Sequence, residues 1–91
     1  MASVVVTLKI MPESPDVDLD AINEKADPMV KAFGGEVGKV EKEPIAFGLV
    51  ALNIFFVLDE AIGATDDLEK NISEIEGVNS VEVTDVRRTI G

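Results

Sequence analysis

Residues 49–58 read LVALNIFFVL, and with the preceding IAFG they form the longest apolar run of the chain, Ile45–Leu58. A strand with one face in water alternates apolar and polar residues, but Asn53 is the only polar residue of this run. The run therefore predicts a strand in the middle of a sheet. The face predicted to pack against helices holds Leu52, Ile54, Phe56 and Leu58. The opposite, open face is predicted to hold Ala51, Asn53, Phe55 and Val57, joined by Val5 and Thr7 of the first strand.

Three further segments have the period of strands. Residues Ser3–Met11 place alternate apolar side chains on one face. Residues 36–45 are weakly apolar, and their mixed Lys and Glu side chains are typical of an edge strand, with Gly38 as the expected position of a bulge. Residues 78–88 form the last predicted strand, in which two valines share one face.

The first helix is predicted over Leu19–Phe33, where apolar residues recur at helical spacing. Asp16 or Asp18 is a suitable N-cap, and the two glycines after Phe33 end the helix. Pro28 removes an amide donor inside this segment. We therefore expect a kink at Asp27–Pro28, or a second short helix that starts there with Asp27 as its cap.

The second helix is predicted to begin after Thr65, its N-cap, and to stop at Gly77. Two aspartates in its first turn favour the positive end of the helix dipole. The side chains predicted to face the core are Leu68, Ile72 and Ile75.

These elements follow one another in the order β-α-β-β-α-β. With right-handed crossovers, this order gives a four-stranded antiparallel sheet with two helices on one face. We therefore expect an α+β protein, a ferredoxin-like sandwich, formed as a single domain over residues 1–91. The second and third strands are joined by a hairpin that contains Pro44 and Gly48.

The chain is strongly acidic, with 18 acidic and 8 basic side chains and a net charge of −10. Phosphate backbones repel such a protein, and there is no Trp or Tyr to stack on bases. No direct nucleic-acid binding is therefore expected. A basic protein partner matches the charge better, and the alternative is that the charge serves solubility alone.

Several residue types are absent, and this narrows the chemistry. Without cysteine or histidine the chain has no disulfide, no thiolate metal site and no imidazole base, and no cofactor is expected. The N-terminus lacks the pattern of a signal peptide, and the 14 residues of Ile45–Leu58 are too few to span a bilayer as a helix. We expect a cytoplasmic protein without membrane contact.

No arrangement of side chains predicts catalysis. The serines have no histidine to activate them, and no glycine-rich phosphate loop is present. Residues 11–16, MPESPD, are acidic, whereas the small ferredoxin-like enzymes that hydrolyse acyl phosphates need an arginine in this loop. Four carboxylates, Asp59, Glu60, Asp66 and Asp67, lack the spacing of a calcium loop. We therefore expect a binding protein that is not an enzyme and holds no metal.

Two features remain as candidates for binding. Phe47 lies between Ala46 and Gly48 at the entry to the apolar strand, where it either caps the core or projects from the end of the sheet. Arg87 and Arg88 are adjacent in a chain with only eight basic residues. They are either a solvated end of the last strand or a contact.

Three segments of the chain resemble one family. They read VTLKIMPESPDVDLDAI (6–22), EPIAFGLVALNIFFVLDEAIGATDDLEKNI (43–72) and IEGVNSVEVTDVRR (75–88). Together they resemble archaeal translation elongation factor 1-beta, and also the C-terminal exchange domain of its eukaryotic counterpart, over essentially the whole chain. The resemblance implies a ferredoxin-like fold. It also implies guanine nucleotide exchange, with release of GDP from elongation factor 1-alpha, the GTPase that delivers aminoacyl-tRNA to the ribosome.

The resemblance further implies contact residues. The eukaryotic domain carries a Pro-Ile-Gly-Phe-Gly segment whose phenylalanine packs onto the GTPase, and the matching residues here are 44–48. Its Thr-Asp pair aligns with Thr84 and Asp85, but its C-terminal lysine, which disturbs the Mg²⁺ and switch region of the GTPase, has no counterpart. Arg87 or Arg88 is expected to take its place, although the fork of arginine is larger than an ammonium group. The expected partner-binding residues are Pro44, Ile45, Phe47, Gly48, Asp85, Arg87 and Arg88.

The fold alone also permits another class of function. In this alternative the chain is a small regulatory or scaffold module whose open sheet face binds a second copy or an apolar ligand. A monomer or a weak homodimer through that face is expected. Phe55 and Val57 would then be the key residues, whereas exchange activity depends on Phe47.

Overall fold

The computed structural model of the chain describes residues 2–62 and 65–89. Its elements follow the predicted order, with a short 3₁₀ helix, η1, added after the third strand. Their bounds are β1 (Ser3–Pro12), α1 (Leu19–Phe33), β2 (Glu36–Pro44), β3 (Val50–Asp59), η1 (Glu60–Ile62), α2 (Asp66–Ser73) and β4 (Val78–Thr89).

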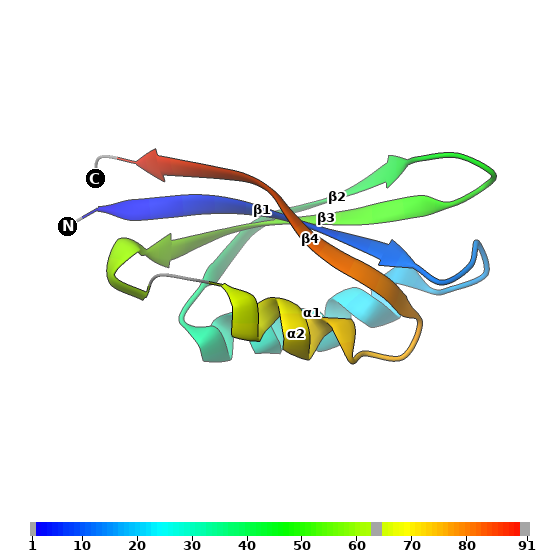
Figure 1. Ribbon diagram of the computed structural model, residues 1–91, viewed down its shortest axis with the longest axis horizontal. Helices are drawn as coiled ribbons and strands as arrows, with labels where there is room; N and C mark the ends of the chain where they lie inside the picture. The colour runs from blue at the N-terminus through cyan, green and yellow to red at the C-terminus, as the bar shows by residue number, and fades with distance from the viewer. Residues whose placement is uncertain (1, 63–64, 90–91) are drawn as a thin grey trace.

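The four strands form one antiparallel sheet in the order β2-β3-β1-β4. Both helices cover the same face of this sheet, so that the protein has two layers (Figure 1). The predicted α+β, ferredoxin-like sandwich is therefore confirmed. The apolar strand β3 lies inside the sheet, and the weakly apolar β2 lies at its edge, as the sequence predicts.

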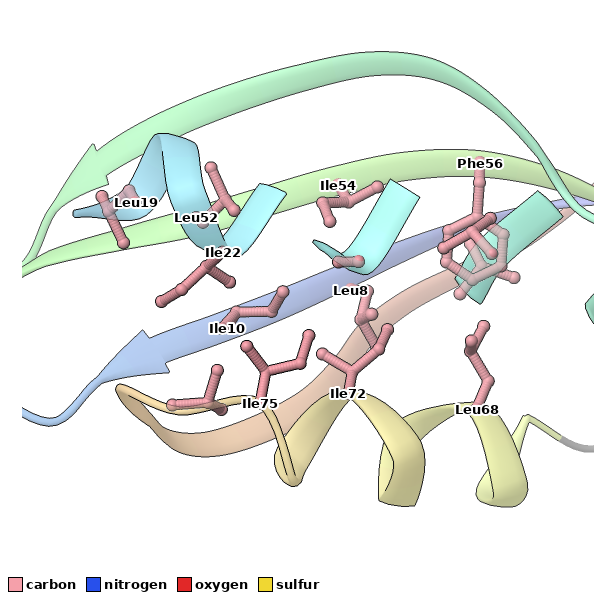
Figure 2. Packing of buried hydrophobic residues seen from close by; sticks show 14 of the residues in the cluster. Leu8, Ile10, Leu19, Ile22, Leu52, Ile54, Phe56, Leu68, Ile72 and Ile75 are labelled. Atoms are coloured by element: carbon pink, nitrogen blue, oxygen red, sulfur yellow. The ribbon is translucent and has the colours of Figure 1, made fainter. Parts of the chain in front are cut away.

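The core lies between the sheet and the two helices. In the pairing of β1 with β3, Val6 is opposite Phe56 and Leu8 is opposite Ile54. All four side chains are buried, and Figure 2 shows that residues of both helices, among them Ile22 and Ile72, meet the strands there. The side chains assigned to the helix-covered face of β3 are buried as predicted: Leu52, Ile54, Phe56 and Leu58.

The open face exposes less apolar surface than the sequence suggests. Phe55 and Val57 share its strand parity with Ala51, which is nevertheless buried. Lys39 of β2 places its ammonium group 5.4 Å from the centre of the Phe55 ring and also pairs with Glu41 at 2.8 Å. Long charged side chains of an edge strand thus cover part of the apolar stripe with their methylene groups.

The bulge expected at Gly38 is present. The pairing of β2 with β3 shifts between Val37 and Lys39, which leaves Gly38 without a partner in the register. Because of this extra residue, Val37 and Val40 are opposite Phe56 and Ile54 and lie on one face. The bulge therefore restores the alternation that the sequence of β2 seems to lack.

The helix α1 differs from one of the two expectations. It runs without interruption from Leu19 to Phe33 with Pro28 inside it, so a second helix capped by Asp27 is wrong. Asp27 instead pairs with Lys31, one turn further on, at 3.0 Å. Pro28 is exposed, and buried Ala26 and Val30 pack on either side of it. The packing of this apolar face outweighs the lost hydrogen bond.

Both ends of α2 differ in detail from the prediction. Thr65 occupies the N-cap position, but its hydroxyl donates to Glu69 at 3.1 Å and makes no capping bond. The helix ends at Ser73, four residues before Gly77. Two i→i+3 bonds tighten the following turn, and Gly77, with a φ of 94°, belongs to the turn that leads into β4. The inward side chains are buried as predicted: Leu68, Ile72 and Ile75.

Two glycines offer a matched test of this packing. A Cβ on Gly35 would lie 2.8 Å from Val30 Cγ1 and 3.1 Å from Phe56 Cδ2, whereas a Cβ on Gly38 meets only a backbone oxygen at 3.8 Å. Gly35→Ala should therefore lower the free energy of unfolding by about 1–3 kcal/mol. Gly38→Ala should change it by no more than about 0.5 kcal/mol. Urea denaturation of the two variants measures both values, and equal losses would contradict the packing described here.

Candidate partner-binding site

The hairpin between β2 and β3 turns at Phe47 and Gly48. The Leu49 N–H donates to the Ala46 carbonyl at 2.9 Å, and the Ile45 N–H donates to the Leu49 carbonyl at 2.9 Å. Both central residues have positive φ, 54° for Phe47 and 78° for Gly48. Glycine adopts this conformation freely, but a side chain with a Cβ pays roughly 1–2 kcal/mol for it. Asn or Gly is the usual choice at such a turn.

Phe47 is also 96% exposed, so the interpretation that it caps the core is wrong. Neither the backbone conformation nor the exposure of an aromatic ring benefits the free protein. The ring projects from the tip of the hairpin, where no core contact holds it. A residue that is unfavourable in the free protein in two ways is a candidate for contact with another molecule.

The other residues expected at this end do lie together. Pro44 is the last residue of β2, where its missing N–H is tolerated because the strand is at the edge. Ile45 follows it and is 40% exposed. A Cβ on Gly48 would lie 3.8 Å from the Pro15 ring, so the turn packs against the loop between β1 and α1. Pro44, Ile45, Phe47 and Gly48 therefore form one surface.

Arg87 and Arg88 lie at the opposite end of the sheet, and Asp85 lies further in, opposite Thr7. Arg88 is opposite Val4, which in turn is opposite Leu58, whereas Pro44 is opposite Val50. Val50 and Leu58 are eight residues apart in β3, which corresponds to about 26 Å at 3.3 Å per residue. Figure 1 shows the hairpin and the end of β4 on opposite sides of the molecule. The structure therefore divides the expected residues into two patches.

The two arginines point to different faces of the sheet. Arg87 is opposite Val5, on the open face, and its Nε lies 2.8 Å from Asp85 Oδ2. Arg88 has the other parity, and its guanidinium lies 2.9 Å from Glu60 Oε1. Such exposed ion pairs contribute at most about 1 kcal/mol, so either arginine can exchange its carboxylate for another anion. A partner that docks on one face meets only one of them.

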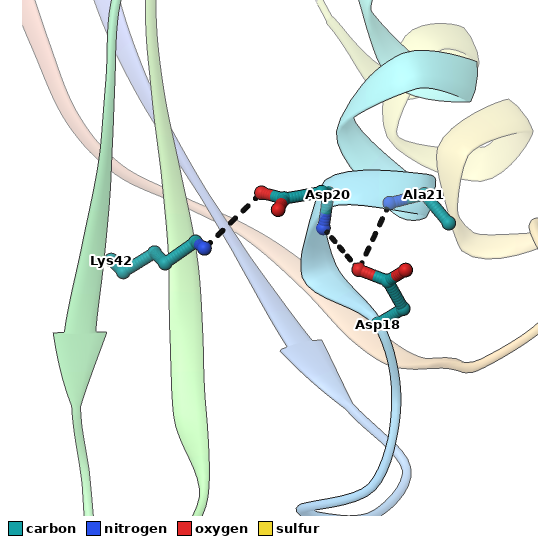
Figure 3. A network of polar contacts seen from close by, with 4 residues as sticks. All are labelled: Asp18, Asp20, Ala21 and Lys42. Atoms are coloured by element: carbon teal, nitrogen blue, oxygen red, sulfur yellow. Dashed lines mark hydrogen bonds and ion pairs between the residues drawn. The ribbon is translucent and has the colours of Figure 1, made fainter.

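Sequence reasoning missed the contribution of the loop between β1 and α1. Asp18 Oδ1 accepts from the N–H groups of Asp20 and Ala21, at 3.0 and 3.4 Å, and so caps α1. Lys42 of β2 reaches Asp20 at 3.1 Å (Figure 3). These contacts place the start of α1 beside the base of the hairpin. The predicted topology already implied that this loop and the hairpin are neighbours, because the end of β1 and the β2–β3 hairpin must lie at the same end of an antiparallel sheet.

The carboxylates between β3 and α2 do not form a metal site. Within residues 2–62 and 65–89, no three acidic side chains gather closely enough to hold an ion. Asp59 instead accepts from the N–H of Ala61 at 2.9 Å, and Glu60 pairs with Arg88.

Across the described ranges, residues 2–62 and 65–89, the chain also contains no helix long and apolar enough to cross a membrane.

Solved structures share this fold. One is the C-terminal domain of the MgtC protein from Mycobacterium tuberculosis, with a TM-score of 0.63 and 12% identity, over 98% of this chain and 87% of that one. Another is the designed protein Foldit4, with a TM-score of 0.63 and 21% identity, over 98% of both chains. At these identities the likeness shows the fold alone. By its fold, the chain is a small ferredoxin-like protein, and an aromatic hairpin protrudes from one end of its sheet.

The sequence identifies the family within that class. Residues 5–89 match the EF-1 guanine nucleotide exchange domain. Elongation factor 1-beta of Methanothermobacter thermautotrophicus is 52% identical over 88 residues, which cover 97% of this chain and 98% of the relative. The corresponding protein of Methanobrevibacter smithii is 50% identical with the same coverage. The chain belongs to the EF-1 guanine nucleotide exchange family, and its function is nucleotide exchange in translation elongation.

The conformation of Phe47 can be tested by stability alone. Phe47→Asn should raise the free energy of unfolding by about 0.5–1 kcal/mol, because asparagine tolerates positive φ and removes an exposed ring. Phe47→Val should lower it, because a β-branched side chain tolerates that conformation least. Chemical denaturation measures both. A loss of stability with asparagine would show that the ring packs against the protein.

Proposed function

We propose that this chain releases GDP from elongation factor 1-alpha and that the exposed ring of Phe47 anchors the contact. The main support is the cost of this residue to the free protein, which is a positive φ of 54° on a ring that is 96% exposed. An aromatic side chain that enters a partner pocket is a frequent hot spot of protein interfaces. The turn also holds the ring in its exposed position before the partner binds, so that little conformational entropy is lost on binding.

The two patches act on one partner in this proposal. Pro44, Ile45, Phe47 and Gly48 make the first contact. Arg87 or Arg88, with Asp85, makes the second, and Arg88 lies about 26 Å along the sheet from the start of β3. A GTPase much larger than this chain can offer both contact points. Because the arginines are held only by exposed ion pairs, one of them can turn to phosphate or to the Mg²⁺ ligands of the nucleotide site.

Exchange of this kind needs no covalent chemistry. The protein has to bind the nucleotide-free GTPase more tightly than the GDP-bound form, and linkage then lowers the affinity for GDP by the same factor. The chain therefore acts as a binding protein and not as an enzyme, in the cytoplasm, with a protein as its partner and without direct contact to nucleic acid. Its net charge of −10 favours a basic surface on that partner.

A GDP-release assay tests the proposal. The chain should accelerate the release of fluorescent GDP from purified elongation factor 1-alpha, and Phe47→Ala should weaken binding about 30-fold, which corresponds to about 2 kcal/mol. Its circular dichroism spectrum should remain that of the unmodified protein. If the variant exchanges nucleotide as fast as the unmodified chain at every concentration, Phe47 is not the anchor.

The arginines provide an internal comparison. Arg87 and Arg88 lie on opposite faces, so only one of Arg87→Ala and Arg88→Ala should reduce the exchange rate at saturating concentration, by tenfold or more. The other variant is its control for charge and for fold. Equal rates for both variants and the unmodified chain would show that this end of β4 is not part of the mechanism.

We also propose that the chain is a monomer. The apolar stripe of the open face is partly covered by its own edge strand, through Lys39 over Phe55, and Val57 is only 37% exposed. Val57→Lys should therefore leave the mass in solution unchanged, as measured by sedimentation. A dimer in the unmodified chain that dissociates in this variant would support the scaffold alternative instead.

A further inference from the structure

A groove of about 300 Å³ lies beside the Phe47 hairpin. One wall comes from the loop between β1 and α1, and the other comes from Lys42 and Val50 at the base of the hairpin. Pro15, which lines the groove, also lies 3.8 Å from the position of a Cβ on Gly48. The groove therefore adjoins the turn that carries Phe47. A molecule that contacts the Phe47 ring can also contact the groove, because the two are continuous on the surface.

The groove is preformed. The Glu13 N–H donates to the Gly77 carbonyl at 2.9 Å, which ties the loop to the turn before β4. Asp18 caps α1 at the other end of the loop, and Lys42 is tied to Asp20 at 3.1 Å. Pro15 lies between these points and stiffens the segment. Little conformational entropy is therefore lost in ordering the loop when a ligand binds.

The lining is apolar with an acidic edge. Its apolar residues come from both walls: Pro12, Pro15, Val17, Leu19 and Val50. Asp18 lines the groove with a carboxylate of which only Oδ1 accepts the capping bonds; for its second oxygen the described part of the chain shows no partner (Figure 3). The charged residues that line the groove are Asp18 and Lys42. The ammonium group of Lys42 is already paired with Asp20 at 3.1 Å, which leaves the Asp18 carboxylate as the unneutralised charge.

We propose that the groove binds a lysine or arginine side chain of the GTPase, a contact that rests on the function proposed above. The long aliphatic stem of such a side chain packs against the prolines and Val50. Its cationic head reaches the second oxygen of Asp18 and makes a charge-assisted hydrogen bond. A purely apolar side chain would leave the acidic edge of the groove desolvated and unpaired, and it fits the site less well. This end of the sheet thus combines the protruding ring of Phe47 with a groove that binds a cationic side chain.

Substitution of Asp18 tests the charge without breaking the helix cap. Asn caps a helix as well as Asp does, so Asp18→Asn keeps the fold and removes only the charge. It should weaken binding to purified elongation factor 1-alpha about tenfold in calorimetry, and should make the affinity less sensitive to salt. Asp16→Asn is the matched control, because it removes the same charge from the same loop but does not line the groove. It should change the affinity less than twofold.

A second pair of variants tests the space itself. Ser14→Phe places a ring in the groove and should weaken binding by tenfold or more, whereas Ser14→Ala leaves the groove open and should bind normally. Ser14→Leu replaces the phenylalanine variant if that variant does not fold by circular dichroism. Normal binding by a folded, filled variant overturns the proposal. Weak binding by the filled variant but not by Asp18→Asn shows an apolar occupant, and this also overturns it.

Two outcomes separate this inference from the proposed function. If the unmodified chain releases GDP and Phe47→Ala weakens it, but Asp18→Asn and Asp16→Asn behave alike, the function stands and the groove contact is wrong. If the unmodified chain neither binds the GTPase nor releases GDP, both are wrong.

Discussion

The pairing of β1 with β3 is the constraint on which the rest of the structure depends. Its register places Val6 opposite Phe56 and Leu8 opposite Ile54, with all four side chains buried under the helices. A slip by one residue would turn the entire apolar set toward water, so the register cannot vary. It determines where β3 begins, and therefore that the turn at Phe47 projects beyond the end of the sheet. The position of Phe47 is a consequence of the core.

Much of the fold could be predicted because the sequence pattern and the tertiary structure agree. Asn53 alone was enough to assign the faces of β3, since a buried amide would need partners that a core does not offer. The prediction failed where local rules compete with packing. Pro28 disfavours a helix locally, but buried residues on both sides keep α1 continuous. The helix α2 does not extend to Gly77 as predicted, because the pattern does not distinguish a C-cap from the turn that follows it.

The candidate site was less accessible to sequence reasoning. The pattern around Phe47 allowed a core position as readily as a contact, because exposure and a positive φ are properties of the folded hairpin. The resemblance to a family suggested candidate residues but not their arrangement, and the register shows that Arg87 and Arg88 lie far from Phe47 and on opposite faces. The groove combines residues from β1, α1, β2 and β3, and no segment of the sequence carries its signal alone.

The distance between the two patches bears on how exchange works. Both patches belong to one hydrogen-bonded sheet, in which β3 starts at the hairpin and pairs with β1, and β1 pairs with β4. The spacing of about 26 Å between the patches is therefore rigid. A partner whose two contact points match this spacing only in its nucleotide-free form gains both contacts in that form and one in the other. In the proposed mechanism, that difference in contact energy lowers the affinity for GDP, whereas equally tight binding to both forms would leave the affinity unchanged. The proposed mechanism therefore depends on the stiffness of the sheet as well as on the residues at its ends.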